Sequence, residues 1–154
     1  MVNSVVRLAQ VDDYEAVEAI MKQVQELHVK WRPDIYKECK VVLAYEEFLE
    51  SVKEESMLVA LQEEKVVGIL AFVYRQVGSD KQVARKVLFI DAMAVDETYR
   101  GRGIGHQLLD MVKLIAKEQN CDGVELQVNA RNVWAKATYE SWGFTEKSIN
   151  MELL

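Results

Sequence analysis

The stretch YRGRGIGHQLLDMV, residues 99–112, decides how this chain is expected to fold. An apolar run at residues 86–95, KVLFIDAMAV, comes before it and has the composition of a buried central strand. After it, apolar residues recur every three or four positions, which predicts a helix to about residue 120. Between strand and helix, glycine and arginine alternate, at Arg100, Gly101, Arg102, Gly103 and Gly105.

A glycine-rich turn at a strand-to-helix junction is suited to binding an anion. Glycine has no side chain to keep a ligand away from the backbone, and it adopts positive φ readily. The first N–H groups of the following helix have no internal partner, and the helix dipole adds partial positive charge. The turn therefore predicts a pyrophosphate site, with Arg100 and Arg102 adding charge. The alternative is a tight loop in which the glycines serve backbone geometry alone.

Two spaced motifs identify a family. The phosphate-binding patterns G-x-x-x-x-G-K-[ST] and G-x-G-x-x-G do not fit, the second because its last position is His106. The pattern R-x-x-G-x-G is matched in full from Arg100 to Gly105. Residues 132–144, NVWAKATYESWGF, also match N-x-x-A-x-x-x-Y-x-x-x-G-F. With both motifs in this order, roughly residues 87–144 resemble the GNAT acyltransferase superfamily, which uses acetyl-CoA to acylate amines.

The rest of the sequence predicts a single α/β domain over residues 1–154. Half of the residues are hydrophobic, enough for a core. The element order is strand, two helices, three strands, helix, strand, helix and strand, which favours three layers with a central mixed, mostly antiparallel sheet flanked by helices. The strands are expected at 4–10, 56–62, 65–75, 86–95, 123–128 and in the tail 144–154; the helices at 12–31, 44–55, 104–120 and 132–143; and a polar loop at 76–85. Asp12 and Glu15 have capping-box spacing at the first helix start.

Charge and cysteine content narrow the function classes. Nineteen basic and 25 acidic residues give a net charge of −6, which argues against nucleic acid as a partner. Cys39, Cys121, His28 and His106 show no zinc-ligand spacing, so no metal is expected. We expect reduced thiols and a cytoplasmic protein. The chain has no run of about 18 apolar residues and no leader-like N-terminus, which predicts no membrane association.

The resemblance implies where the cofactor binds. The end of the central strand would pair with the arm of CoA, the glycine turn would hold the pyrophosphate, and the first residue of the second motif would contact the pantetheine arm while also capping its helix. Cofactor-binding residues implied in this way are Met93, Ala94, Val95, Arg100, Gly101, Arg102, Gly103, Ile104, Gly105 and Asn132.

The resemblance also assigns catalytic roles. The amine would attack bound acetyl-CoA directly, and Tyr139 would protonate the departing sulfur. The alternative for Tyr139 is an amphipathic core residue. Asp91 is the only charge inside residues 87–95, VLFIDAMAV, and a carboxylate inside a buried strand is costly unless it is paired or faces a cleft, so Asp91 is a candidate base. The alternative for Asp91 is an ion pair or hydrogen bonds to a loop, and Glu125 is a weaker candidate base.

Two functions remain open at this point. One is an N-acetyltransferase that moves an acetyl group from acetyl-CoA to a primary amine of a small molecule, polyamine or peptide. The other is a non-catalytic CoA- or nucleotide-binding sensor. The segment between the first two helices borders the acceptor site in similar folds; its candidates are His28, Trp31, Arg32, Asp34 and Tyr36, with a solvated loop as the alternative. The alternating tail favours either a homodimer or a strand that completes the chain's own sheet.

Overall fold

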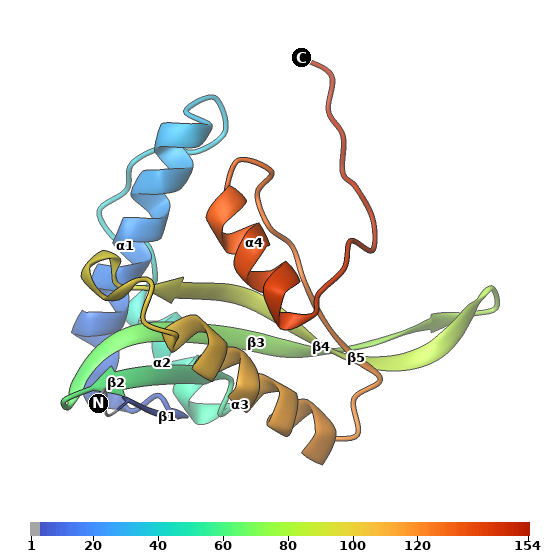
Figure 1. Ribbon diagram of the computed structural model, residues 1–154, viewed down its shortest axis with the longest axis horizontal. Helices are drawn as coiled ribbons and strands as arrows, with labels where there is room; N and C mark the ends of the chain where they lie inside the picture. The colour runs from blue at the N-terminus through green and yellow to red at the C-terminus, as the bar shows by residue number, and fades with distance from the viewer. Residues whose placement is uncertain (1–3) are drawn as a thin grey trace.

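The computed structural model describes residues 4–154, so residues 1–3, the start of the predicted domain, lie outside it. Its helices pack on both sides of one five-stranded sheet, as Figure 1 shows. The elements are β1 (Ser4–Leu8), η1 (Val11–Asp13), α1 (Tyr14–Trp31), α2 (Tyr45–Lys53), β2 (Met57–Gln62), β3 (Lys65–Ser79), β4 (Gln82–Val95), η2 (Glu97–Tyr99), α3 (Ile104–Glu118), β5 (Gly123–Leu126) and α4 (Val133–Trp142).

The predicted fold class is confirmed. The strands lie in chain order, β1 to β4 pair antiparallel, and β5 joins β4 in parallel, so the sheet is mixed and mostly antiparallel. Alternate strand residues face opposite sides. Leu58 and Leu70 pack with α3 and α4 on one face, and Val59 and Ile69 pack with α1 and α2 on the other. Two apolar clusters therefore separate three layers.

One irregularity in β4 positions the site. The register with β3 shifts so that Ala71 opposes Ala92 while Phe72 opposes Ile90, which makes Asp91 the extra residue of a bulge. The pairing with β5 ends at Ile90, but the pairing with β3 continues to Val95. The stretch Asp91–Val95 therefore has a neighbouring strand on one side only.

The polar loop predicted at residues 76–85 is wrong. β3 and β4 continue as a hairpin until Ser79 opposes Gln82, and Figure 1 shows this arm projecting beyond the helices. The polar residues of this arm hide the strand pattern in the sequence. Basic side chains of the hairpin also lie over its aromatic rings. The Arg75 guanidinium lies 3.5 Å from the centroid of Phe89, which stabilises the exposed arm by a cation–π contact.

The strand predicted in the tail is also absent, since residues 144–154 form neither strand nor helix. Ile149 is 73% exposed and Met151 is 87% exposed, so their alternation finds no apolar face within the chain. In Figure 1 the tail, in red, stands apart from the sheet. A strand needs a neighbour for its backbone groups, and the described chain places none beside this segment.

The capping box predicted with Asp12 and Glu15 is wrong, because the box is formed two residues earlier, by Gln10 and Asp13 at η1. Asp13 accepts a hydrogen bond from the Gln10 N–H at 2.8 Å, and α1 begins at Tyr14, directly after it. Asp13 is buried and accepts two more hydrogen bonds from Arg7, at 2.7 and 3.0 Å. Burial alone would raise the pKa of Asp13, but these hydrogen bonds and the Arg7 charge lower it overall. The carboxylate therefore joins β1 to the start of α1.

Candidate functional site

The glycine turn between η2 and α3 has the predicted backbone. Gly101 and Gly103 adopt φ of +79° and +82°, and Gly103 is the N-cap of α3 in the left-handed region. Residues other than glycine rarely adopt this backbone conformation. A Cβ built on either residue meets no heavy atom within 4 Å. These glycines therefore set the path of the chain and leave open space over the turn.

The turn carries unsatisfied donors and positive charge. The Gly103 carbonyl accepts the N–H of Gln107 at 3.1 Å, and the N–H groups before it in α3 have no intrahelical acceptor. Arg100 and Arg102 are exposed. Arg100 donates its Nε–H to the Val95 carbonyl at 3.1 Å, which ties the turn to the end of β4. The arrangement suits an anion with several oxygens.

Gly105 marks the place where β4, α3 and α4 meet. A Cβ built on it lies 3.6 Å from Met93 Cε and 4.0 Å from Thr138 Cγ2. Met93, Ala94 and Val95 are half-buried. The structure therefore brings the predicted end of the central strand, the glycine turn and the second motif together.

The second motif forms α4 with the predicted ends. Asn132 is its N-cap, and its Oδ1 accepts the N–H of Ala135 at 3.2 Å. Gly143 ends the helix at φ +118°. Both capping predictions are confirmed, whereas contact between Asn132 and a cofactor stays a prediction.

Tyr139, a residue of α4, lies in the core cluster that α3 and α4 form with the sheet, and it is 8% exposed. Its ring meets Phe144 edge-on, with the centroids 5.8 Å apart. Burial raises the pKa of Tyr139 to about 12. At neutral pH the hydroxyl therefore keeps its proton.

The two predicted carboxylates have different surroundings. Asp91 is exposed at the bulge, and within residues 4–154 it makes neither the ion pair nor the side-chain hydrogen bond of the alternative interpretation, so its role as a base stays a prediction. Glu125 lies 2.9 Å from Lys147 and 3.3 Å from Arg85. The hydrogen bond from Lys147, assisted by Arg85, lowers the pKa of Glu125, which makes it a poorer base.

The predicted acceptor residues gather at the end of α1. The ring of His28 lies between Trp31 and Tyr36, at centroid distances of 6.0 and 4.7 Å, and burial lowers its pKa. The Arg32 guanidinium binds Asp34 through two hydrogen bonds, of 2.9 and 2.7 Å. These residues form a cluster of neighbouring rings and an ion pair to exposed Asp34, and the place of this cluster at an acceptor site stays a prediction.

Sequence reasoning missed two residues that hold this cluster. Arg131, before α4, donates to the Trp31 carbonyl at 2.6 Å. Glu152, in the tail, forms an ion pair with Arg32 at 2.6 Å. Both contacts join segments about a hundred residues apart, and the local sequence carries no signal for such pairs. Together they connect α1 to α4 and to the tail.

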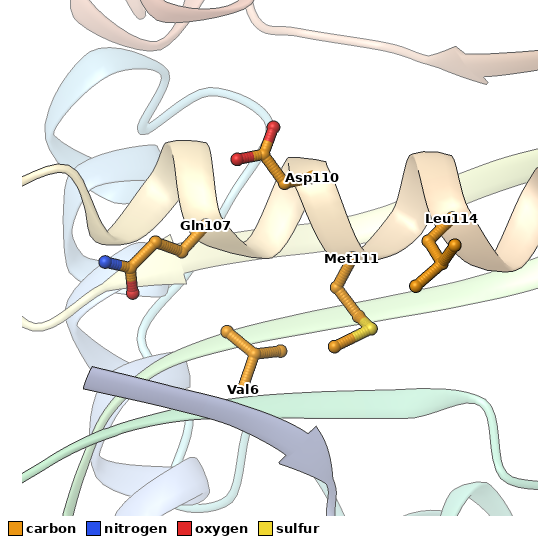
Figure 2. A pocket seen from close by; sticks show the side chains of 5 residues that line it. All are labelled: Val6, Gln107, Asp110, Met111 and Leu114. Atoms are coloured by element: carbon orange, nitrogen blue, oxygen red, sulfur yellow. The ribbon is translucent and has the colours of Figure 1, made fainter. Parts of the chain in front are cut away.

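Two hollows lie near these elements. One, of about 190 Å³, lies between α1 and the turn and includes Arg100 among its lining residues. The other, of about 290 Å³, lies between β1 and α3 and contains no predicted site residue; Figure 2 shows its lining, Val6, Gln107, Asp110, Met111 and Leu114. Over residues 4–154 no three potential metal ligands cluster, and no helix there has the length and apolarity to cross a membrane.

Comparison with known sequences agrees with the motifs. The sequence model of the Acetyltransferase (GNAT) family matches residues 21–144. A mycothiol acetyltransferase of Brachybacterium faecium is 32% identical over 64% of this chain and 29% of its own length. An uncharacterized N-acetyltransferase of Methanocaldococcus jannaschii is 32% identical over 74% of this chain and 50% of its own length. The chain thus spans half or less of the length of these curated relatives.

Solved structures share the whole fold. A Bacillus halodurans protein, crystallised as a mutant, has a TM-score of 0.90 and 34% identity over 97% of this chain and 98% of its own. An aminoglycoside N-acetyltransferase in complex with CoA has a TM-score of 0.74 over 100% of this chain and 95% of its own, at 15% identity. At that identity the likeness shows the fold alone.

Proposed function

We propose that this chain, which belongs to the acetyltransferase (GNAT) family, moves an acetyl group from acetyl-CoA directly to a primary amine. The acceptor class is a small molecule, a polyamine or a peptide. One observation carries the proposal: β4 loses its β5 neighbour at Asp91–Val95, beside a glycine turn that is open and positively charged. Acetyl-CoA supplies the activated thioester.

The residues present fit the donor. The diphosphate would accept hydrogen bonds from the N–H groups of Gly103, Ile104 and Gly105, with Arg100 and Arg102 nearby. The space over the turn is open to such a ligand, since a Cβ built at Gly101 or Gly103 meets no heavy atom within 4 Å. The pantetheine arm would pair with the free side of β4 at Met93, Ala94 and Val95, and Asn132 would contact it from the start of α4. A free strand edge offers such hydrogen bonds without rearrangement.

Proton transfer completes the proposed reaction. The amine nitrogen forms a bond with the acetyl carbon, and the bond from that carbon to sulfur breaks. A backbone N–H at the end of β4 stabilises the negative charge on the carbonyl oxygen. Tyr139 gives its proton to the departing sulfur, since burial keeps the hydroxyl protonated at neutral pH.

Asp91 is the proposed base. An alkyl amine near pKa 10.4 is almost fully protonated at pH 7, so the attacking amine must lose a proton. Asp91 begins the freed stretch of β4 and is not neutralised by a cation among the described residues, whereas Glu125 is held by two. A water molecule between Asp91 and the amine would carry the proton.

A thiol-release assay tests this function against the sensor alternative. Acetyl-CoA is mixed with the protein and with amines, amino acids, polyamines or aminoglycosides in turn, and free CoA thiol is measured. Release that requires both the protein and one amine class supports the enzyme. CoA-dependent thermal stabilisation without release for any acceptor supports the sensor, and no stabilisation by millimolar CoA removes both.

The exposed tail leads us to propose a homodimer. Ile149, Met151 and Leu153 alternate with polar residues and are 73 to 99% exposed, so a second copy is the natural cover for them. Light scattering at tens of micromolar would show a dimer mass, and deletion of residues 149–154 would return it to a monomer that still binds CoA. A monomer mass for the full chain would contradict this.

We also propose a cytoplasmic location for the protein, with Cys39 and Cys121 reduced.

A further inference from the structure

One face of α4 packs against α3, and the two helices run in the same direction. Trp142 donates its Nε1–H to Asp110 Oδ1 at 3.0 Å. Four residues earlier in α4, Thr138 approaches Gly105, which is five residues earlier in α3. Residues four apart lie on the same face of a helix, one turn above the other. The two contacts therefore run in parallel along both helices.

The next residue on this face is Trp134, one turn before Thr138. The same step back along α3 from Gly105 passes the start of the helix and reaches the turn at Gly101–Gly103. Trp134 is 83% exposed, which fits a position beyond the end of α3. The helix register therefore places Trp134 on the face of α4 that leads toward the turn that we assign to the diphosphate.

The indole lies on a different face from the residues assigned to the pantetheine arm. Asn132, Ala135 and Tyr139 share a stripe with the spacing i, i+3 and i+7, and that stripe leads from the helix cap into the core. Trp134 is two residues after Asn132, about 200° around the helix. The diphosphate of CoA joins the pantetheine arm to the nucleotide. Because Trp134 faces away from the residues assigned to the arm, the nucleotide is the part of CoA that would lie next to Trp134.

We propose that the indole of Trp134 stacks on the adenine base of CoA. The inference rests on the proposed function, because it needs CoA on the glycine turn. An exposed indole is a flat apolar surface, and stacking between a base and an aromatic side chain is favourable. Trp134 would then be a binding residue that lies inside the second motif but at one of its unspecified positions.

Ligand fragments separate this role from general CoA binding. Trp134→Ala should weaken CoA binding roughly tenfold, in line with loss of one base–aromatic contact, and leave 4′-phosphopantetheine affinity unchanged. Trp134→Phe should retain most of the CoA affinity. Adenosine 3′,5′-bisphosphate should quench the indole fluorescence of the wild type and have little effect on Trp134→Phe, where Trp31 and Trp142 remain.

Val133→Ala is the matched control, because Val133 is exposed, adjacent and on another face of α4. It should bind every ligand as the wild type does. Equal CoA affinity for the wild type and Trp134→Ala would overturn the stacking role and leave the proposed function standing. An equal loss for 4′-phosphopantetheine would also overturn it, and a wild type that binds no CoA would overturn both.

Discussion

On the turn side of the molecule, made of Asp91–Val95, residues 100–105 and α4, backbone geometry shapes the site. Two glycines at positive φ, a bulge and a helix cap define it. On the α1 side, made of the end of α1, residues 32–44 and the tail, side chains define it. Tilted ring pairs and ion pairs such as Arg32 with Glu152 hold those segments together.

The difference explains how strictly each side is tied to residue type. A positive φ demands glycine, and a cap demands a short polar side chain, so the turn side tolerates few substitutions. Exposed ion pairs contribute little individually and can be exchanged for other polar pairs. We infer that the turn side fixes the donor while the α1 side is free to vary with the acceptor.

The largest effect should come from Tyr139→Phe, which keeps the ring and removes the proton. If Tyr139 protonates the sulfur, kcat should fall by about 10² to 10⁴ while CoA affinity is kept. Tyr74→Phe, on the projecting hairpin, is the matched control and should leave kcat unchanged. Stopped-flow thiol release measures both, and an unchanged kcat for Tyr139→Phe would assign this residue to packing alone.

Asp91→Asn should lower kcat/KM by about 10² at neutral pH, because the amide cannot accept the amine proton. The loss should shrink at high pH, where more of the amine is already neutral. Glu125→Gln removes a carboxylate that two cations already hold, and it should behave as the wild type. Similar pH–rate profiles for the two variants would show that Asp91 is not the base.

Gly103→Val should abolish stabilisation by CoA. At about 100 times the dissociation constant the wild type gains roughly 2.7 kcal/mol, which differential scanning fluorimetry detects as a higher Tm. Gly143→Val is the control for backbone strain, because Gly143 also has positive φ and open space around its Cβ position. Both variants should melt lower than the wild type, but only Gly143→Val should still respond to CoA.

The smallest effect should come from Glu152→Gln on the α1 side. Loss of the exposed ion pair with Arg32 should change the KM for the acceptor by at most about fivefold and leave CoA affinity unchanged. Glu146→Gln breaks another exposed tail pair, with Lys136 at the turn side, and should leave the acceptor KM unchanged. A change in CoA affinity for Glu152→Gln would contradict the division between the two sides.

The same difference decides what the sequence was able to predict. The strand, the turn at Gly101 and Gly103 and the cap at Asn132 follow from residue type, because each backbone state admits few side chains. The ties from Arg131 and Glu152 to the end of α1 were missed, since long-range polar pairs leave no periodic pattern. The alternation in the tail predicts a strand conformation, but it does not predict the neighbouring strand that such a segment needs.

Buried Tyr139 also links the stability of the fold to alkaline pH. Its folded-state pKa of about 12 lies above the usual value of 10, so the folded chain holds this proton more tightly than the unfolded chain. This stability is fully present below pH 10 and is lost as the pH rises toward 12. The loss amounts to roughly 3 kcal/mol, since each pKa unit corresponds to about 1.4 kcal/mol. The proton that Tyr139 donates in the proposed reaction therefore also stabilises the folded core.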